Sequence, residues 1–271
     1  MSSASETDAQ RAFEDLYVTF YRHACRTLTN VQQHSADDLY WIVTGFPHPM
    51  ANAVIRTHWD GERMETLDQR IATTLAPFQA RGAPMMWYLW PTSSPEELGD
   101  HLVTSGFVAD HASPMMSFDL SAAPPSAPAA ARIERVNDQQ SFARWVTVVI
   151  DGFGFPESAR ALATDLFMAL GYSDPFYQYL AWLGDEPAAA ASLVLDDTNA
   201  GIFNVATLPA MRGKGIGSAI TAHALHEAHA AGRHSALLVA SEMGEPVYRR
   251  LGFQTCGMVR EYVWQPQPTA E

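Results

Sequence analysis

A glycine-rich stretch in the last third of the chain, residues 212–217 (Arg-Gly-Lys-Gly-Ile-Gly), has the composition of an anion-binding loop. An apolar run at residues 201–207 precedes it and stops at Pro209, and a periodic segment at residues 218–231 follows it and ends at Gly232. These patterns predict a strand, a loop and a helix in that order. Glycines allow backbone N–H groups to approach a phosphate closely, and the N-terminus of a helix adds positive potential. The stretch therefore predicts a site for a phosphorylated ligand.

Two common phosphate-binding motifs do not fit this loop. The P-loop requires four residues between its first glycine and a Gly-Lys-Ser/Thr triplet, and no stretch of the chain has that spacing. The dinucleotide fingerprint requires a wider last gap than the one between Gly215 and Gly217.

The spacing Arg212-x-x-Gly215-x-Gly217, with Pro209 three residues before the arginine, resembles the acyl-CoA loop of the GNAT N-acyltransferases. A second motif follows in the order of that family, because residues 248–253 (Tyr-Arg-Arg-Leu-Gly-Phe) are similar to its Tyr-x-x-x-Gly-Phe ending. The resemblance implies a GNAT fold and acetyl-CoA as the acyl donor. The alternative is a glycine loop that only turns the chain.

The resemblance also implies which residues bind the donor. Backbone N–H groups of residues 213–218, with the side chains of Arg212 and Lys214, would hold the pyrophosphate, and residues 205–207 would pair with the pantetheine arm. A backbone N–H of that strand would face the thioester oxygen. Ser241 stands where the family often has an asparagine that contacts the cofactor. The predicted donor-binding residues are Val205, Ala206, Thr207, Arg212, Gly213, Lys214, Gly215, Ile216, Gly217, Ser218 and Ser241.

Tyr248 corresponds to the family tyrosine whose hydroxyl lies near the CoA sulfur and acts as general acid. A phenol with a pKa of ~10 is protonated at neutral pH and can donate to a developing thiolate. The alternative is a tyrosine that only packs in a helix. The general base is not identified: Glu242, Asp151, Asp174 and a chain of waters are all candidates, whereas Asn204 on the strand cannot accept a proton.

Other residues have a structural alternative. His223, His226 and His229 recur every third position, so they drift around a helix and do not converge on one metal ion. We expect a solvated face there and no metal site. The aromatic, glycine-containing stretches at residues 152–156 and 171–177 either line the acceptor pocket, as the resemblance implies, or anchor loops to the core.

The composition is that of a soluble globular protein. The 271 residues are 47% hydrophobic and 17% charged, and no apolar run is long enough for a membrane helix. The polar first residues show no signal peptide, and two cysteines, Cys25 and Cys256, form no disulfide framework, so we expect a cytoplasmic protein. A net charge of −13 argues against nucleic acid and mildly favours a cationic acceptor. The only lysine, Lys214, lies in the glycine loop.

The two halves of the chain show the same order of elements. In the second half a strand (201–207), a helix (218–231), Gly232, a strand (235–240) and a helix ending in Gly-Phe follow one another. In the first half the same order runs through residues 51–59, 64–78, Gly82, 85–90 and a helix ending at Gly106-Phe107. This predicts a diverged internal repeat, the alternative being an unrelated α/β cap. The first copy has one glycine in its loop and Leu102 in place of Tyr248, so we expect it to be non-catalytic.

The predicted fold class is therefore α/β (mixed α+β), with two tandem GNAT-like domains, each a mostly antiparallel sheet flanked by helices. Residues 1–120 form the degenerate domain, residues 121–131 a Pro/Ala linker and residues 132–271 the catalytic domain. Residues 1–10 are expected to be disordered.

The predicted function is transfer of an acetyl group from acetyl-CoA to a primary amine of a small molecule, by direct transfer in a ternary complex. Two alternatives remain open. One is a non-catalytic acyl-CoA sensor or regulator, and the other is acetylation of an amine on a protein or an aminoacyl-tRNA. The sequence does not identify the acceptor or the oligomeric state.

Overall fold

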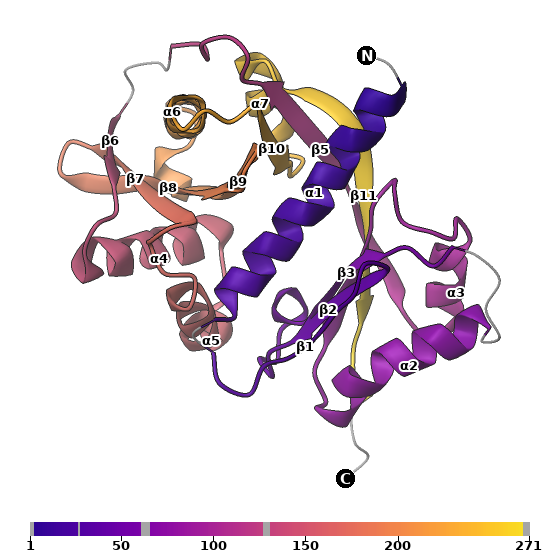
Figure 1. The fold of residues 1–271 in the computed structure, drawn as a ribbon. Helices are drawn as coiled ribbons and strands as arrows, with labels where there is room; N and C mark the ends of the chain where they lie inside the picture. The colour runs from indigo at the N-terminus through magenta and orange to yellow at the C-terminus, as the bar shows by residue number, and fades with distance from the viewer. Residues whose placement is uncertain (1–2, 27, 61–65, 127–130, 268–271) are drawn as a thin grey trace. The chain divides into compact units, whose positions relative to one another are not determined.

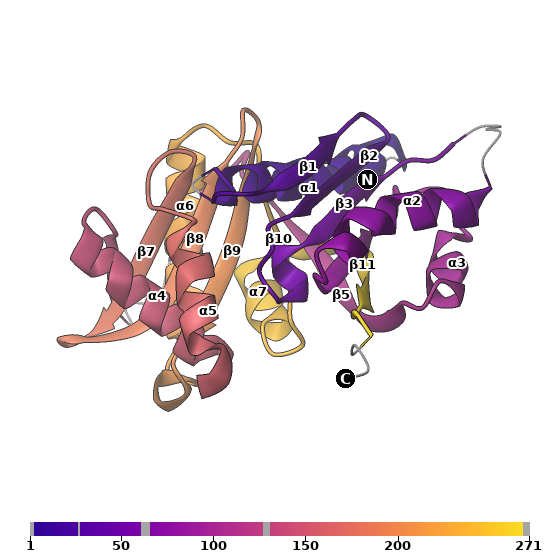
Figure 2. The same ribbon diagram turned by 90° about the horizontal axis from the view of Figure 1, so that it is seen from below.

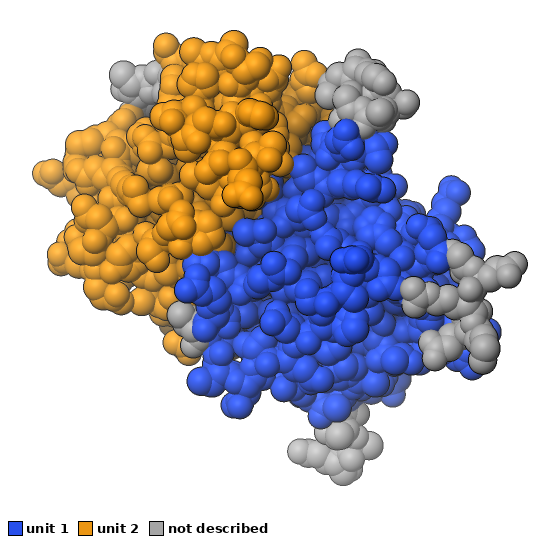
Figure 3. All heavy atoms as spheres, in the orientation of Figure 1, with its two compact units in different colours: residues 1–113, 257–271 blue, residues 114–256 orange. Residues whose placement is uncertain are grey.

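The computed structural model describes residues 3–26, 28–60, 66–126 and 131–267 of the chain. These form two compact units, coloured separately in Figure 3. Unit 1 contains residues 1–113 and 257–271, and unit 2 contains residues 114–256. Each unit has its own hydrophobic core.

The sheet of unit 2 has the strand order β5-β10-β9-β8-β7-β6. Neighbouring strands are antiparallel except β9 and β10, which are parallel. The bounds are β5 Val108–Asp119, β6 Arg132–Arg135, β7 Phe176–Leu183, β8 Glu186–Leu195, β9 Asn199–Thr207 and β10 Ser235–Val239.

Helices cover both faces of this sheet. Figure 1 shows α6 on one side of β7, β8 and β9, and α4 and α5 on the other, and Figure 2 shows α4 and α5 crossing these strands. The bounds are α4 Gln139–Phe153, α5 Glu157–Met168, α6 Ile216–Ala230 and α7 Glu245–Leu251. The core is rich in alanine, since Ala188, Ala189 and Ala191 on β8 are fully buried beside Ile216 and Ile220 of α6. Small side chains let the helices approach the sheet closely.

Unit 1 repeats this plan with the strand order β1-β2-β3-β4-β11. Here β3 and β4 are the parallel pair. The strands are β1 Gln32–Ser35, β2 Leu39–Val43, β3 Ala53–Thr57, β4 Met85–Leu89 and β11 Gln254–Trp264, and the helices are α1 Ser3–Ala24, η1 Pro49–Ala51, α2 Leu67–Ala80 and α3 Leu98–Thr104. Helix α2 packs through Ile71, Leu75 and Phe78 on a cluster that includes Trp87. Helix α1 is fixed to β3 by Glu14, which is fully buried and pairs with Arg56 of β3 at 3.5 Å and with His58, just after β3, at 2.9 Å.

The last strand of each sequence copy completes the sheet of the other unit. Residues 115–119 of β5, which ends the first copy, pair with β10 of unit 2. Residues 260–264 of β11, which ends the second copy, pair with β4 of unit 1. The compact units therefore differ from the predicted domain ranges, because residues 114–131 belong to unit 2 and residues 257–271 to unit 1. Residues 127–130 of the predicted linker lie outside the described residues.

The predicted fold class, mixed α/β with a mostly antiparallel sheet and flanking helices, is confirmed. The predicted strand–helix–strand–helix order occurs in both halves. The predicted disorder of the first ten residues is wrong for those that the structure describes. Residues 3–10 belong to α1 and are therefore not disordered, because the helix with the apolar stripe already begins at Ser3. Residues 1–2 lie outside the described residues. None of the described helices has both the length and the apolar character that a membrane crossing requires.

Candidate active site in unit 2

The two parallel strands of unit 2 separate after a short paired segment. In the described residues, β10 pairs with β9 only where residues 235–237 face residues 199–201. Beyond that point β9 continues to Thr207 paired with β8 alone. One edge of the second half of β9 is thus left without a strand partner. Such an edge can pair with an extended ligand.

Val205 and Thr207 direct their backbone groups to this open edge. Leu208 donates its N–H to the Ala188 carbonyl of β8 at 3.0 Å, and Ala206 faces Ala190 of the same strand. Because backbone groups alternate between the two edges of a strand, the N–H groups of Val205 and Thr207 point away from β8. Two of the predicted donor-binding residues therefore present backbone groups to the opening, whereas Ala206 presents its side chain to α4. A Cβ added at Gly152 would lie 2.8 Å from the Ala206 Cβ atom.

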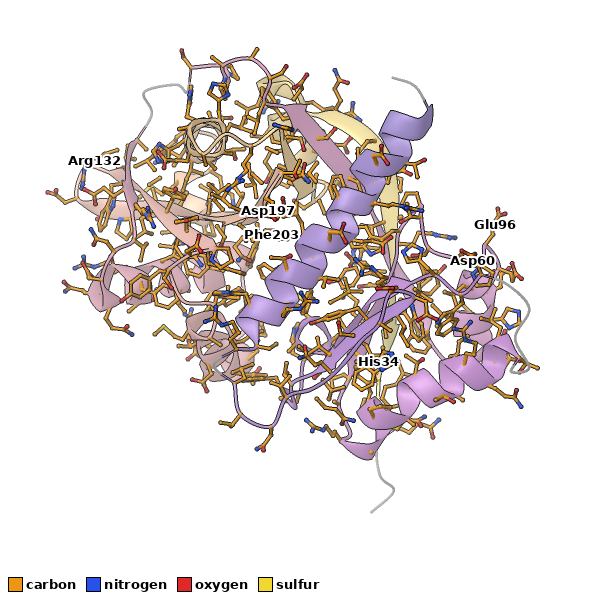
Figure 4. All side chains as sticks on the ribbon, in the orientation of Figure 1. His34, Asp60, Glu96, Arg132, Asp197 and Phe203 are labelled. Atoms are coloured by element: carbon orange, nitrogen blue, oxygen red, sulfur yellow. The ribbon has the colours of Figure 1, made fainter. Side chains whose placement is uncertain are left out.

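A β-bulge at Asn204 and Val205 bends β9 at the start of the open edge. Ala190 faces Ala206 and Ser192 faces Phe203, so two residues of β9 oppose the single Ala191 of β8. Phe203, which is labelled in Figure 4, directly precedes the bulge. Asn204 has φ = 52°, in the left-handed region that asparagine tolerates better than most residues. The bulge directs the second half of β9 away from a regular ladder.

The glycine loop ends in a helix whose first N–H groups are free. Gly213 and Gly215 have φ values of 75° and 77°, which only glycine adopts without strain. Gly215 is the N-cap of α6, and no side chain of the described residues caps this helix. The first intrahelical bond runs from Ala219 N to Gly215 O, so the N–H groups of residues 216–218 have no intrahelical acceptor. The first turn contains no acidic residue. This end of α6 is therefore suited to an anion.

The two cations of the loop have different environments. The guanidinium of Arg212 donates to the Thr207 carbonyl at 3.2 Å and to the Gly152 carbonyl at 2.8 Å, so it fixes the loop to β9 and to the end of α4. The Lys214 ammonium is exposed, with the Met211 sulfur 3.6 Å away. Lys214 is thus free to reach a phosphate, whereas Arg212 already uses two of its N–H groups.

Tyr248 lies in α7 and remains protonated over a wide pH range. Its side chain is 8% exposed and packs edge-to-face on Phe253, with ring centroids 5.9 Å apart. Burial raises the pKa of Tyr248 to about 12. Its hydroxyl has no hydrogen-bond partner among the described residues, so it is available to an incoming group. Ser241, beside it, accepts a hydrogen bond from Gly244 N at 3.1 Å and thereby stabilises the turn that precedes α7.

The three candidate bases are not equally available. The Asp151 carboxylate pairs with Arg160, and the Asp174 carboxylate accepts a hydrogen bond of 2.7 Å from the Tyr177 hydroxyl. Glu242 is exposed at the surface just after β10. The general base stays unassigned.

The histidines of α6 serve the packing of unit 2. His226 and His229 donate hydrogen bonds to the Pro125 and Leu120 carbonyls, at 3.2 and 2.9 Å. His223 packs edge-to-face on Tyr179, and its burial lowers its pKa. His226 is exposed, as expected of a solvated face, whereas His223 and His229 are half-buried because Tyr179 and the segment after β5 pack on this side of α6. Within the described residues, the side chains that come together as possible metal ligands are Asp110, His111 and Glu261 of unit 1, none of which was predicted.

Most of the aromatic residues in the two predicted acceptor stretches anchor loops. Phe155 packs on Phe167, and Tyr172 packs on Phe142. Phe176 is fully buried. Phe153 differs, since it is 49% exposed at the end of α4, next to the Gly152 carbonyl that binds Arg212. Phe153 is the residue of these stretches that is best placed to contact a ligand.

In unit 1 the corresponding opening is closed. The register of β2 and β3 also shifts, which makes Ile55 an extra residue of β3. The Trp90 indole, directly after β4, donates to the Ile55 carbonyl at 2.6 Å, and Ser94 N donates to Thr57 O at 3.1 Å. The side chain and the loop thus occupy the edge that is free in unit 2.

The helix end of unit 1 is closed as well. Thr66 and Gln69 form a capping box at the start of α2, and Asp68 adds a negative charge to its first turn. Leu102 stands in the place of Tyr248 and is fully buried. Residues 61–65, which correspond to the glycine loop, lie outside the described residues. These features support the expectation that the first copy is non-catalytic.

Comparisons with known proteins agree with this geometry. Residues 175–255 match the family model described as acetyltransferase (GNAT) domain. The chain is similar to a GCN5-related N-acetyltransferase from Kribbella flavida, with 18% identity, a TM-score of 0.72 and 96% of each chain covered. A GCN5-related N-acetyltransferase from Sphaerobacter thermophilus gives 14% identity and a TM-score of 0.61, over 98% of this chain and 95% of the other.

A third solved structure has the tandem arrangement in its description. It is a tandem GNAT protein from the clavulanic acid biosynthesis pathway, with 13% identity, a TM-score of 0.59, and coverage of 95% of this chain and 96% of the other. At these identities the likeness shows the fold. A comparison with curated protein sequences found no significant match.

Proposed function

We propose that this chain, which carries an acetyltransferase (GNAT) domain at residues 175–255, transfers an acetyl group from acetyl-CoA to a primary amine of a small molecule in the cytoplasm. The observation that carries the proposal is the combination of an open β9 edge with an uncapped α6 N-terminus at its end. An extended pantetheine arm fits the edge, and a pyrophosphate fits the helix end. Unit 1 has the same two elements with both positions closed.

The proposed reaction is direct transfer. The amine nitrogen attacks the thioester carbonyl carbon, and the oxygen that gains charge accepts a hydrogen bond from the Val205 N–H. Before the attack, the protonated amine loses a proton to a base or to water. The carbon–sulfur bond then breaks, the CoA thiolate takes the proton of the Tyr248 hydroxyl, and the proton released by the new amide nitrogen returns through solvent to the tyrosinate. A phenol whose pKa is raised to about 12 by burial is fully protonated at neutral pH and can fill this role.

Features of the site favour a cationic acceptor with an apolar part. The chain carries a net charge of −13, which attracts amines that are protonated in solution. Phe153 and Met243 are 49% and 63% exposed, at the end of α4 and in the turn before α7. The alternatives remain an acyl-CoA sensor without turnover and an acetyltransferase for an amine on a protein or an aminoacyl-tRNA.

The first test is thermal unfolding with and without acetyl-CoA. A ligand at 100 times its Kd adds about 2.7 kcal/mol of stability to the folded state. We expect this shift in the wild type and not in the Gly215→Glu, Gly217→Glu double variant. Lys214→Glu repeats the test without altering a left-handed glycine, and Gly184→Glu is the control for strain, because Gly184 has φ = 63° in a hairpin away from the loop.

The second test is release of CoA thiol in the presence of an amine panel. Transfer to small amines supports the enzyme. A folded wild type that shows no shift with acetyl-CoA contradicts the proposal, and a shift without transfer to any amine favours the sensor.

A further inference from the structure

A buried chain of polar side chains runs through three strands of unit 2 to the bulge in β9. Asn204 Nδ2 donates to Ser192 Oγ at 2.9 Å, and Ser192 Oγ donates to Gln178 Oε1 at 2.6 Å. Gln178 Nε2 then donates to the Gly171 carbonyl at 2.9 Å. Gln178 and Ser192 are fully buried. The chain thus connects the bulge with the turn before β7.

The hydrogen bonds of this chain have one direction. The Gly171 carbonyl can only accept, so Gln178 turns its amide nitrogen toward it and its oxygen toward Ser192. Ser192 must then use its single proton on Gln178 and accept from Asn204. Because no member can be reversed without leaving a buried group unpaired, the side chain of Asn204 has one stable orientation.

These hydrogen-bonded polar side chains lie next to a run of buried alanines. Ala188, Ala189, Ala190 and Ala191 precede Ser192 on β8, and all four are fully buried. An alanine at position 192 would fit the pattern and would avoid the desolvation of a hydroxyl. The polar chain therefore calls for a reason other than packing.

The buried polar side chains are explained by the bulge in β9, which they hold in place. Asn204 holds the left-handed backbone conformation of the bulge, and the next residue, Val205, directs its N–H to the open edge of β9. Across the bulge, the Ala191 carbonyl accepts a hydrogen bond of 3.1 Å from the fully buried Trp145 indole. The bulge is thus fixed on the side of β8 by Asn204 and on the side of α4 by Trp145.

We infer that Gln178, Ser192 and Asn204 are positioning residues that aim the Val205 N–H at the carbonyl oxygen of a bound thioester. The inference rests on the proposed function and adds the group that orients the hydrogen-bond donor. The turn at Gly171 belongs to the same positioning network, because Gln178 donates a hydrogen bond to the Gly171 carbonyl.

The test compares Asn204→Gly and Ser192→Ala with Ser235→Ala. Glycine keeps the left-handed backbone at position 204 and removes only the amide. Ser235 donates to Asn199 Oδ1 at 2.7 Å, between β10 and the other end of β9, so its variant removes a similar bond away from the bulge. The readouts are the carbonyl stretching frequency of bound acetyl-CoA labelled at its carbonyl carbon, the Kd values of acetyl-CoA and CoA, and turnover with the best amine.

We expect the bound carbonyl of the wild type to absorb at lower frequency than in water, and that of Asn204→Gly and Ser192→Ala to return toward the free value. CoA affinity should change less than about twofold, whereas kcat should fall at least about tenfold, because a small misplacement of a transition-state donor has a large effect. Ser235→Ala should match the wild type in all readouts.

Unchanged carbonyl frequency and kcat in a folded Asn204→Gly variant would overturn the inference and leave the proposed function intact. A wild type that binds neither acetyl-CoA nor CoA overturns both. If the wild type binds acetyl-CoA without transfer to any amine, the enzyme proposal falls, and the carbonyl frequency still decides the role of the polar chain.

Discussion

The Trp90 indole nitrogen donates a hydrogen bond of 2.6 Å to the Ile55 carbonyl, and this contact closes the strand opening of unit 1. Trp90 directly follows β4, as Ala240 directly follows β10 in unit 2. A large side chain in one copy and a small one in the other thus distinguish two otherwise similar sheets. The closed copy keeps its register shift at Ile55, so the backbone framework of the opening has remained although the opening is filled.

Trp90→Ala should lower the free energy of unfolding without creating a second acetyl-CoA site. Trp90 is 2% exposed, and removal of such a side chain costs about 3–5 kcal/mol. The capping box of α2 still closes the helix end in this variant. Urea unfolding measures the loss, and calorimetry should give one acetyl-CoA per chain for both proteins. A second binding event in the variant would contradict our account of unit 1.

Tyr248→Phe should lower kcat about 100-fold or more, with acetyl-CoA affinity and stability close to wild type. The hydroxyl forms no hydrogen bond within the described residues, so its removal leaves no buried partner unpaired. Because burial raises the pKa of Tyr248 to about 12, the acid form persists well above pH 10. We therefore expect no fall of kcat between pH 8 and about pH 10.5 from this group. A descending limb near pH 9 that disappears in the variant would contradict the assignment.

Lys214→Met should weaken acetyl-CoA binding in a salt-dependent way. The ammonium is exposed, so its attraction to a phosphate is modest and screened. We expect about a fivefold rise of Kd at low ionic strength and about twofold in 0.5 M salt. Arg11→Met, which removes an exposed cation of unit 1, is the control and should leave the Kd unchanged. Equal effects of the two variants would show that net charge, and not Lys214 itself, attracts the ligand.

Gly215→Ala and Gly217→Ala should change stability in opposite directions. Gly215 has φ = 77°, so a side chain there costs about 1–2 kcal/mol. Gly217 lies in the first turn of α6 outside the left-handed region, and a Cβ would lie 3.4 Å from Thr207 Oγ1, an ordinary contact. Alanine at 217 should therefore stabilise the helix by about 0.5 kcal/mol. Thermal unfolding without ligand measures both, and a loss of stability in Gly217→Ala would show that the helix end is packed more tightly.

Local patterns were sufficient to predict most of the elements and the loop of the site. Periodicity predicted α6, and alternate glycines predicted the loop before it, because both signals depend only on neighbours in the chain. The bulge at Asn204 was missed. A single asparagine in an apolar strand is its only local sign, and the partner that fixes it, Ser192, lies on another strand.

The closure of unit 1 shows the same limit. Trp90 was placed at the end of a strand, but its bond to Ile55 depends on the pairing of β3 and β4. His223 and His229 of α6 were assigned to solvent but are half-buried, because periodicity does not reveal that Tyr179 and Leu120 contact that helix.

The exchanged last strands set an order for folding during synthesis. The strand that pairs with β4, residues 260–264, follows all of unit 2 in the chain and is therefore made after it. Domains usually fold one after another as they leave the ribosome. Here the β4 edge, which is rich in apolar side chains, stays unpaired until the residues of unit 2 have been made. The two copies must therefore complete their folding together, and either half of a protein cut within residues 121–131 would by itself lack one strand of its sheet.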